Sequence, residues 1–280
     1  MLRISSRNAR FQQWEALLGN RAKRQRAGEF LVHGVRPITL AAEYGWRFRA
    51  LLADADRPLS AWARNLLRDV PALQVAMAPE LLAELGEKEE GPPELIAVVE
   101  MPNDDLHRIA AGPSFLGVVL DRPASPGNVG SIIRSADAFG ADGVVVTGHA
   151  ADVYDPRAVR ASTGSLFARP VVRCPSHREV MTWVEAQRAA GCPVVLAAAD
   201  EHGATDVFDA DLTQPVLLLV GNETTGLTAA WRELCDLSVR IPITGAASSL
   251  NAANAATAIL YEITRQRLMT QRLMTERLRT

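Results

Sequence analysis

The second half of the chain alternates apolar runs of strand length with segments of helical character, and this alternation constrains the fold most. Nearly continuous apolar runs are typical of strands that are buried on both faces of a parallel sheet. The runs lie at residues 115–120, 143–146, 194–199, 216–220 and 238–243. Helices are predicted at 129–139, capped by Asn128, at 180–190 and at 251–265. We therefore expect an α/β fold with an open parallel sheet and helices on both of its faces.

The first hundred residues mix helical and strand signals. Phe11, Trp14 and Leu17 recur at three- and four-residue steps, as on one face of a helix, and short apolar runs predict strands. A polar stretch with little periodicity follows and predicts a domain boundary. We expect a smaller α/β domain over 1–100, a linker over 101–113, and a second domain over 114–265.

The last fifteen residues, 266–280, are predicted to be a basic C-terminal extension. They consist of three similar five-residue units, QRLMT, QRLMT and ERLRT. Five residues turn a helix by about 500°, so successive leucines point about 140° apart. Such a repeat cannot form one core stripe, and we expect the extension to be weakly ordered.

The charge of the chain is concentrated at its start. Residues 1–36 carry eight basic and two acidic side chains, whereas the whole chain has a net charge of −2. A basic end on an otherwise acidic protein suggests a polyanionic partner. A solvated basic helix is the alternative explanation.

Several classes of protein are excluded or disfavoured. No apolar run approaches the roughly 18 residues of a membrane helix, and the start lacks the apolar stretch of a signal peptide. The chain has three cysteines, far apart and without a Cys-x-x-Cys pair, and five scattered histidines. We expect reduced thiols, no metal site, no membrane association and a cytoplasmic location.

The glycine fingerprint of dinucleotide-binding folds is missing, as are the Walker A, G-x-S-x-G and H-E-x-x-H motifs, which disfavours oxidoreductases, kinases and simple hydrolases. Instead, three segments rich in Gly, Asn and Ser follow predicted strands, at 126–134, 220–227 and 241–254. Loops at the carboxyl ends of parallel strands are where ligands bind in open sheets. These three loops are therefore the candidate site.

The three loops carry motifs in a fixed order. They read Asn128-x-Gly130-x3-Arg134, Gly221-x-Glu223-x2-Gly226-Leu227 and Ile241-Pro-x2-Gly-x3-Ser249-Leu-Asn251. Together they resemble the signature motifs of the SpoU (TrmH) ribose 2′-O-methyltransferases of the SPOUT superfamily, and the likeness extends over residues 115–265. The first hundred residues resemble the L30-type α/β RNA-binding domain of that family.

The resemblance implies a trefoil knot in the C-terminal domain, S-adenosylmethionine bound in the knot loops, and a homodimer. Within the family the chain is similar to enzymes that methylate 23S ribosomal RNA, so a uridine 2′-hydroxyl in that RNA is the expected substrate and antibiotic resistance the expected purpose. A tRNA ribose methyltransferase and a non-catalytic ribosome- or RNA-binding protein are the alternatives.

The resemblance also assigns roles to residues of the loops. The implied catalytic residues are Asn128, Arg134, Glu223, Ser249 and Asn251. Since arginine has a pKa above about 12, we expect Arg134 to bind a phosphate and stabilise alkoxide charge rather than remove a proton. The alternatives are an Arg134–Asp137 surface pair, a helix-start charge for Glu223, and helix capping for the short polar residues.

Cofactor and RNA contacts complete the expected site. By resemblance, main-chain groups at Gly221, Ile241 and Leu250 hold the cofactor, with Asn251 and with Ala198 at the end of the preceding strand. Ile241 and Leu250 as plain core residues are the alternative. The candidates for phosphate contacts lie in one basic cluster, Arg21, Lys23, Arg24 and Arg26.

Overall fold

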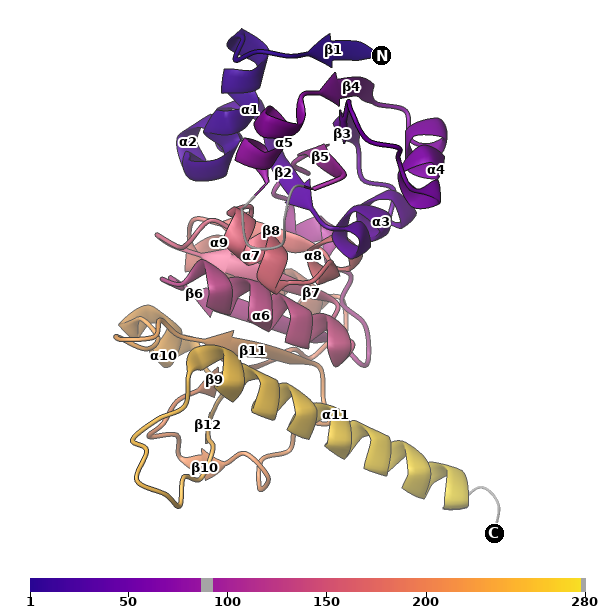
Figure 1. The fold of residues 1–280 in the computed structure, drawn as a ribbon. Helices are drawn as coiled ribbons and strands as arrows, with labels where there is room; N and C mark the ends of the chain where they lie inside the picture. Colours follow the sequence, from indigo (N-terminus) through magenta and orange to yellow (C-terminus); the bar gives the residue numbers. More distant parts are fainter. Residues whose placement is uncertain (87–92, 278–280) are drawn as a thin grey trace. The chain divides into compact units, whose positions relative to one another are not determined.

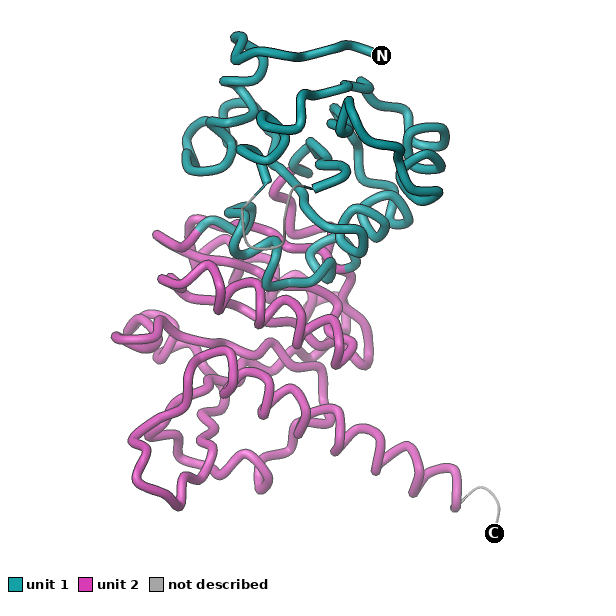
Figure 2. The backbone as a smooth tube through the Cα atoms, viewed as in Figure 1, with its two compact units in different colours: residues 1–102, 152–168 teal, residues 103–151, 169–280 magenta. Residues whose placement is uncertain are grey.

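The computed structural model describes residues 1–86 and 93–277, which form two compact units. Unit 1 contains residues 1–102 and 152–168, and unit 2 contains residues 103–151 and 169–280 (Figure 2). The final residues of the predicted extension, 278–280, lie outside the described residues. The chain thus passes from one unit to the other three times. The sequence pattern did not show that residues 152–168 belong to unit 1.

Unit 1 is built on a five-stranded mixed sheet with the strand order β1-β4-β3-β5-β2. Its strands are β1 (Leu2–Ile4), β2 (Glu29–His33), β3 (Phe48–Asp54), β4 (Leu73–Met77) and β5 (Leu95–Glu100). Strand β4 pairs parallel with both β1 and β3, and β5 pairs antiparallel with both β3 and β2. Strands β1 and β4 were not anticipated, because each is short and interrupted by polar residues.

Among its described residues, unit 1 contains seven helices. They are α1 (Ala9–Gly19), α2 (Arg21–Ala27), α3 (Val35–Glu43), α4 (Ala61–Asp69), α5 (Pro79–Leu85), α7 (Pro156–Ala161) and α8 (Ser165–Ala168). Asn8 caps α1 by accepting a hydrogen bond from the Phe11 amide at 3.0 Å. As predicted, α1 buries Phe11, Trp14 and Leu17, which pack in the core of the unit.

Unit 2 contains the predicted parallel sheet, now with seven strands in the order β10-β12-β9-β11-β6-β7-β8. The strands are β6 (Leu116–Asp121), β7 (Gly143–Thr147), β8 (Val171–Cys174), β9 (Val195–Ala199), β10 (Thr205–Asp206), β11 (Val216–Val220) and β12 (Leu237–Arg240). All six pairings are parallel. The central strand β11 is buried along its whole length, which explains its uninterrupted apolar sequence.

Helices cover both faces of this sheet, as the sequence predicted. The helices are α6 (Pro126–Ala138), α9 (His177–Ala189), α10 (Ala229–Leu234) and α11 (Ala252–Arg277), with a 3-10 turn at Leu106–Arg108. Trp183 of α9 and Trp231 of α10 share a core cluster with Val119 and Leu219 of the sheet. Helices α6 and α11 pack against each other and against β6, β7 and β9 (Figure 1).

Several boundaries differ from the sequence predictions, among them the following three. Helix α6 begins earlier, because Ser125 and not Asn128 is its N-cap and Pro126 takes the first helical position. Strand β12 ends at Arg240 rather than at residue 243. Helix α11 continues through the repeat to Arg277, so the extension is helical where it was expected to be weakly ordered.

The segment predicted as a linker, 101–113, has its own contacts within unit 2. Ile109 is buried in the core cluster of the sheet, and the Asp104 carboxylate lies 2.7 Å from Nη2 of Arg173. Within the described ranges, no helix combines the length and the hydropathy that a membrane crossing requires.

Candidate functional site

The three motif loops leave the same edge of the sheet of unit 2. In the register of the sheet, Val220 at the end of β11 lies opposite Leu120 of β6 on one side and Ala199 of β9 on the other. The carboxyl ends of these three neighbouring strands therefore meet. The loops that follow β6 and β11 begin side by side, at the position where open α/β sheets bind ligands.

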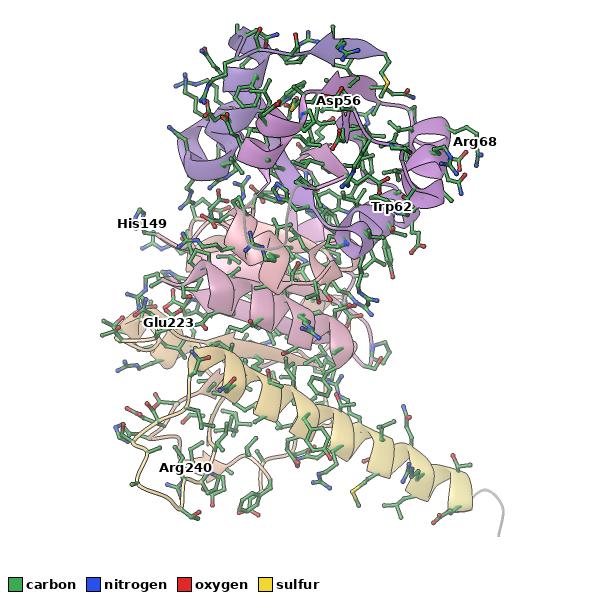
Figure 3. All side chains as sticks on the ribbon, in the orientation of Figure 1. Asp56, Trp62, Arg68, His149, Glu223 and Arg240 are labelled. Atoms are coloured by element: carbon green, nitrogen blue, oxygen red, sulfur yellow. The ribbon has the colours of Figure 1, made fainter. Side chains whose placement is uncertain are left out.

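Glu223 joins the first two loops (Figure 3 labels it on the loop before α10). Its Oε2 accepts a hydrogen bond from the Ala124 amide at 2.8 Å, and its Oε1 accepts from the Ser125 amide at 3.1 Å. Oε1 also accepts from Nδ2 of Asn128 at 2.9 Å. The carboxylate thus holds the start of α6 and fixes the orientation of the Asn128 amide.

The protonation state of Glu223 follows from these contacts. Partial burial by itself raises the pKa of its carboxyl, but the hydrogen bonds from Ala124, Asn128 and Ser125 outweigh that effect and leave the pKa below its usual value of 4.5. At neutral pH the group is an ionised acceptor with its oxygens occupied. It is suited to positioning and not to removing a proton.

Asn251 brings in the third loop. Its Nδ2 donates to Oδ1 of Asn128 at 3.1 Å, so Glu223, Asn128 and Asn251 form one chain of hydrogen bonds from three loops. Its Oδ1 accepts from the Ala253 amide at 2.9 Å, at the start of α11. Asn251 therefore caps the start of α11, as the alternative explanation expected, and also belongs to the network that joins the three loops.

Arg134 lies on α6, six residues after Asn128, and its side chain is exposed. The alternative surface pair with Asp137 is not what the structure shows, since Asp137 accepts a hydrogen bond from Nε of Arg169 at 2.8 Å. Among residues 1–86 and 93–277, no hydrogen bond or ion pair engages the Arg134 guanidinium. Its donors therefore face solvent and are available to a substrate.

Ser249, like Arg134, is a predicted catalytic residue whose side chain lies outside the network of Glu223, Asn128 and Asn251. It lies in the exposed loop 241–250, as does Leu250, whose side chain is 42% exposed. Leu250 is therefore not the core residue of the alternative explanation, and Ile241 is only half-buried. Within the described part of the chain, the main-chain groups of this loop make no hydrogen bonds with other backbone groups.

These features fit a cofactor held by main-chain groups, as the resemblance implied for Gly221, Ile241 and Leu250. The loop 241–250 offers unpaired amides and carbonyls beside apolar side chains, which suits a purine ring and a short zwitterion. Ala198 is buried in β9 between Leu219 and Ser238 of the neighbouring strands, so its side chain is part of the sheet at this edge. Of the described residues, no three His, Cys, Asp or Glu side chains lie close enough to hold a metal ion.

Gly221 is packed too closely for any side chain. A Cβ added there would overlap the carbonyl carbon of Gly226 and the nitrogen of Leu227, and would lie 2.8 Å from the Gly226 Cα. All three neighbours are backbone atoms of the same tight loop, which is closed by the bridge between Asn222 and Gly226. Glycine at this position therefore sets the shape of the second loop.

Gly221→Ala is expected to weaken S-adenosylmethionine binding about 10- to 100-fold, because forcing atoms into a packed structure costs about 1–3 kcal/mol. Isothermal titration calorimetry measures the affinity. Gly112→Ala is the matched control, since a Cβ at Gly112 meets nothing within 4 Å. Equal affinities of the two variants would contradict a role for the Gly221 loop in holding the cofactor.

Two residues that sequence reasoning missed brace the first loop against the second. Asp121, only 3% exposed, accepts a hydrogen bond from the Thr228 amide at 2.9 Å. Arg122 has a left-handed φ of 52°, its carbonyl accepts from Nδ2 of Asn222 at 2.8 Å, and its Nη2 donates to the Gly226 carbonyl at 3.1 Å. The signal was an aspartate that ends an otherwise apolar strand, which indicates a buried carboxylate with fixed partners.

The basic cluster requires one correction. Arg24 is only 2% exposed, and its Nε and Nη2 both lie 2.8 Å from Oδ2 of Asp152. It is therefore unavailable to a phosphate, contrary to the sequence prediction. Arg21, Lys23 and Arg26 are exposed on α2, as expected. The prediction was wrong for Arg24 because its partner lies 128 residues away in the sequence.

Comparisons with known proteins agree with these loops and units. The family profile described as "SpoU L30e-like domain" matches residues 8–97, and that described as "SpoU rRNA Methylase family" matches residues 116–261. The chain is 70% identical, over 95% of its own length and 93% of the relative, to the 23S rRNA (uridine(2479)-2'-O)-methyltransferase of Streptomyces viridochromogenes. It is 29% identical, over 92% of its length and 97% of the relative, to the 23S rRNA (guanosine(2553)-2'-O)-methyltransferase RlmP of Bacillus subtilis.

Solved structures give the same result. The crystal structure of the SpoU methyltransferase AviRb from Streptomyces viridochromogenes, in complex with AdoMet, superposes with a TM-score of 0.91 at 70% identity and covers 94% of this chain and 99% of that one. An AdoMet-bound rRNA methyltransferase from Sinorhizobium meliloti superposes with a TM-score of 0.83 at 29% identity and covers 94% and 97%.

Proposed function

This chain belongs to the SpoU family of S-adenosylmethionine-dependent RNA methyltransferases, and from that premise we propose that it methylates the ribose 2′-hydroxyl of one uridine in 23S ribosomal RNA. The observation that carries the substrate is the 70% identity, over 95% of the chain, to a relative named for that reaction. The relative of this chain that acts on guanosine is only 29% identical.

The chain's own residues have separable tasks in this reaction. S-adenosylmethionine, when bound, supplies a methyl group that its sulfonium already activates. The protein must then position the 2′-hydroxyl and accommodate the loss of its proton. The Glu223–Asn128–Asn251 chain holds the three loops in register, and Asn128 and Asn251 present amide groups toward the ribose. Arg134 binds the adjacent phosphate and stabilises charge that develops on the ribose oxygen.

Glu223→Gln is expected to lower kcat about 10- to 100-fold, because the amide cannot accept every hydrogen bond that the carboxylate receives and charged hydrogen bonds contribute about 1.5–3 kcal/mol. Single-turnover transfer of a tritiated methyl group measures the rate.

The pH dependence provides an independent check on Glu223. Because the pKa of Glu223 in the folded protein lies below 4.5, its contribution to stability is present above that pH and is lost as the pH falls through the lower value. The wild-type rate should therefore show no inflection from Glu223 between pH 6 and 8. An inflection in that range that disappears in Glu223→Gln would instead identify Glu223 as the base.

The trefoil knot, a homodimer, a cytoplasmic location and a role in antibiotic resistance complete the proposal. The knot is supported by the match of residues 116–261 to the SpoU rRNA methylase family, in whose members it is expected by resemblance. A dimer is supported by large apolar side chains exposed along α11, among them Tyr261 at 58% and Leu273 at 57%. The three free cysteines are consistent with a reducing compartment.

Methyl transfer to separate RNAs tests the proposed function. The protein is incubated with tritiated S-adenosylmethionine and unmodified 23S rRNA, 16S rRNA or tRNA, and labelled sites are mapped by reverse-transcription stops at low nucleotide concentration. Label at one uridine of 23S rRNA is the expected result. Label only in tRNA would show that tRNA, and not 23S rRNA, is the substrate. The absence of S-adenosylmethionine binding would overturn the enzymatic function.

A further inference from the structure

The buried Arg24 is the centre of a polar cluster inside unit 1. Besides its two contacts with Asp152, Arg24 donates from Nη1 to the carbonyls of Leu17 and Leu18, at 2.7 and 3.0 Å. Asp152 in turn accepts from the Tyr154 amide at 3.1 Å through its second oxygen. A buried arginine with this many partners joins the end of α1 to the start of the segment 152–168.

The same segment completes the core beside β2. The ring of Tyr154 lies 4.7 Å from that of Phe30, and the ring of Phe167 lies 5.0 Å from that of Trp46. The Trp46 indole donates to the Phe167 carbonyl at 3.0 Å. A Cβ added at Gly164 would meet Leu40 of α3. Residues 152–168, which lie within the stretch that matches the methylase profile, are therefore an integral part of unit 1.

This arrangement brings cations from distant parts of the sequence together. Arg157 of α7 donates from Nε to Asp155 at 3.0 Å, and the same carboxylate lies 3.9 Å from Nη2 of Arg24. On α2, Lys23 and Arg26 are three residues apart and exposed, so they share a helix face beside the inward-pointing Arg24. Further along the same segment, the Thr163 carbonyl accepts a hydrogen bond from Nε of the exposed Arg36 at 3.3 Å.

We propose that Lys23, Arg26, Arg36 and Arg157 form one phosphate-binding surface, here called the basic face, and that Arg24 is the positioning residue that holds its two halves together. The proposal rests on the proposed function, because it assigns the RNA contacts of the same enzyme. The sequence predicted phosphate contacts in residues 21–26 only. The basic face adds a residue of α7, which lies within the stretch that matches the methylase profile.

The charge of the basic face suits a polyanion, and the proposed function makes that polyanion an RNA backbone. Three of its four cations come from residues 1–36, which carry a net charge of +6 on a chain of −2 overall. Arg24 adds nothing to the outward charge, since Asp152 neutralises it. Contacts of arginine and lysine side chains with phosphates fix the register of the nucleic acid without reading its bases.

The salt dependence of RNA binding tests the basic face. The full-length wild type and the single variants Lys23→Ala, Arg26→Ala, Arg36→Ala and Arg157→Ala are titrated against a 23S rRNA transcript at several salt concentrations. Loss of one phosphate contact reduces the slope of log K against log salt by about 0.7–0.9. We expect that reduction for each variant, and the same reduction with an RNA of unrelated sequence.

Arg68→Ala is the matched control for Arg157→Ala. Both arginines are exposed to 68% on helices of unit 1, and each pairs with an aspartate close by in the sequence, Asp69 or Asp155. Arg68→Ala should keep the wild-type slope. A wild-type slope for Arg157→Ala would overturn the contribution of α7, and unchanged slopes with lost binding to phosphatidylserine vesicles would assign the face to membranes instead.

Methyl transfer at saturating RNA separates this test from that of the proposed function. If the wild type labels 23S rRNA while Arg157→Ala and Arg68→Ala bind it identically, the contribution of α7 to the basic face is wrong and the proposed function stands. If the wild type labels no RNA although the slopes fall as expected, the face stands and the enzymatic function is wrong.

Discussion

Arg134→Ala is expected to lower kcat for methyl transfer about 10²- to 10³-fold while S-adenosylmethionine binds with nearly unchanged affinity. The magnitude follows from the effect of removing one donor that stabilises a developing oxyanion. The exposed guanidinium makes no ion pair among the described residues, so its removal leaves no buried partner and should not disturb the fold. Single-turnover methyl transfer and calorimetry of cofactor binding, measured on the same preparation, separate the two effects.

Two further variants decide how Arg134 acts. Arg134→Lys keeps the charge but loses the planar donor pair, so it should retain an intermediate rate if phosphate binding is bidentate. Arg178→Ala removes another exposed arginine, from α9 of the same unit, and should leave the rate unchanged. A rate for Arg134→Ala within threefold of the wild type would exclude Arg134 from the reaction.

The sequence predicted the sheet of unit 2 well because its strands are buried on both faces. The prediction for 216–220 coincides with β11, whose five residues are all buried. Two strands that are very short or contain a polar residue were not predicted. Strand β10 has two residues, and β8 contains Arg173, which pairs with Asp104. Apolar continuity marks the centre of a parallel sheet and fades toward its edges.

The error at the start of α6 clarifies how the site works. Asn128 is a residue type that often caps helices, but here Ser125 is the N-cap. The Ser125 hydroxyl accepts a hydrogen bond from the backbone N–H of Asn128 at 3.3 Å. The Asn128 side chain is therefore released from capping and bonds to Glu223 and Asn251 instead. Residue preferences thus predicted a helix start near residue 128 correctly but chose the wrong N-cap. The contacts that engage the Asn128 side chain come from two other loops, which local preferences do not show.

The position of residues 152–168 could not be predicted from local pattern. Their strand and helix signals are weak, and the contacts that place them in unit 1 join residues more than a hundred positions apart, such as Arg24 with Asp152 and Trp46 with Phe167. A basic cluster likewise gives no sign of which of its members points inward. Only the structure separates Arg24, which is buried, from Lys23 and Arg26, which are not.

Arg24→Met is expected to destabilise unit 1 by about 3–5 kcal/mol, the usual effect of removing one partner from a buried ion pair. Methionine fills a similar length of side chain, so the loss comes mainly from the Asp152 carboxylate, which is left buried without its cation. Hydrogen exchange at the amides of β2 and of 152–168 measures the free energy of opening within unit 1 itself, without interference from the unfolding of unit 2.

The double variant Arg24→Met/Asp152→Asn distinguishes a lost charge pair from lost packing. Asparagine keeps an oxygen that can accept from the Tyr154 amide, and it removes the unpaired buried charge. Most of the stability lost in Arg24→Met should therefore return, whereas Arg68→Met, on the exposed pair with Asp69, should show no measurable change. If the double variant is as unstable as Arg24→Met, the contacts of Arg24 with the carbonyls of Leu17 and Leu18 hold the segment, and the charge of Asp152 does not.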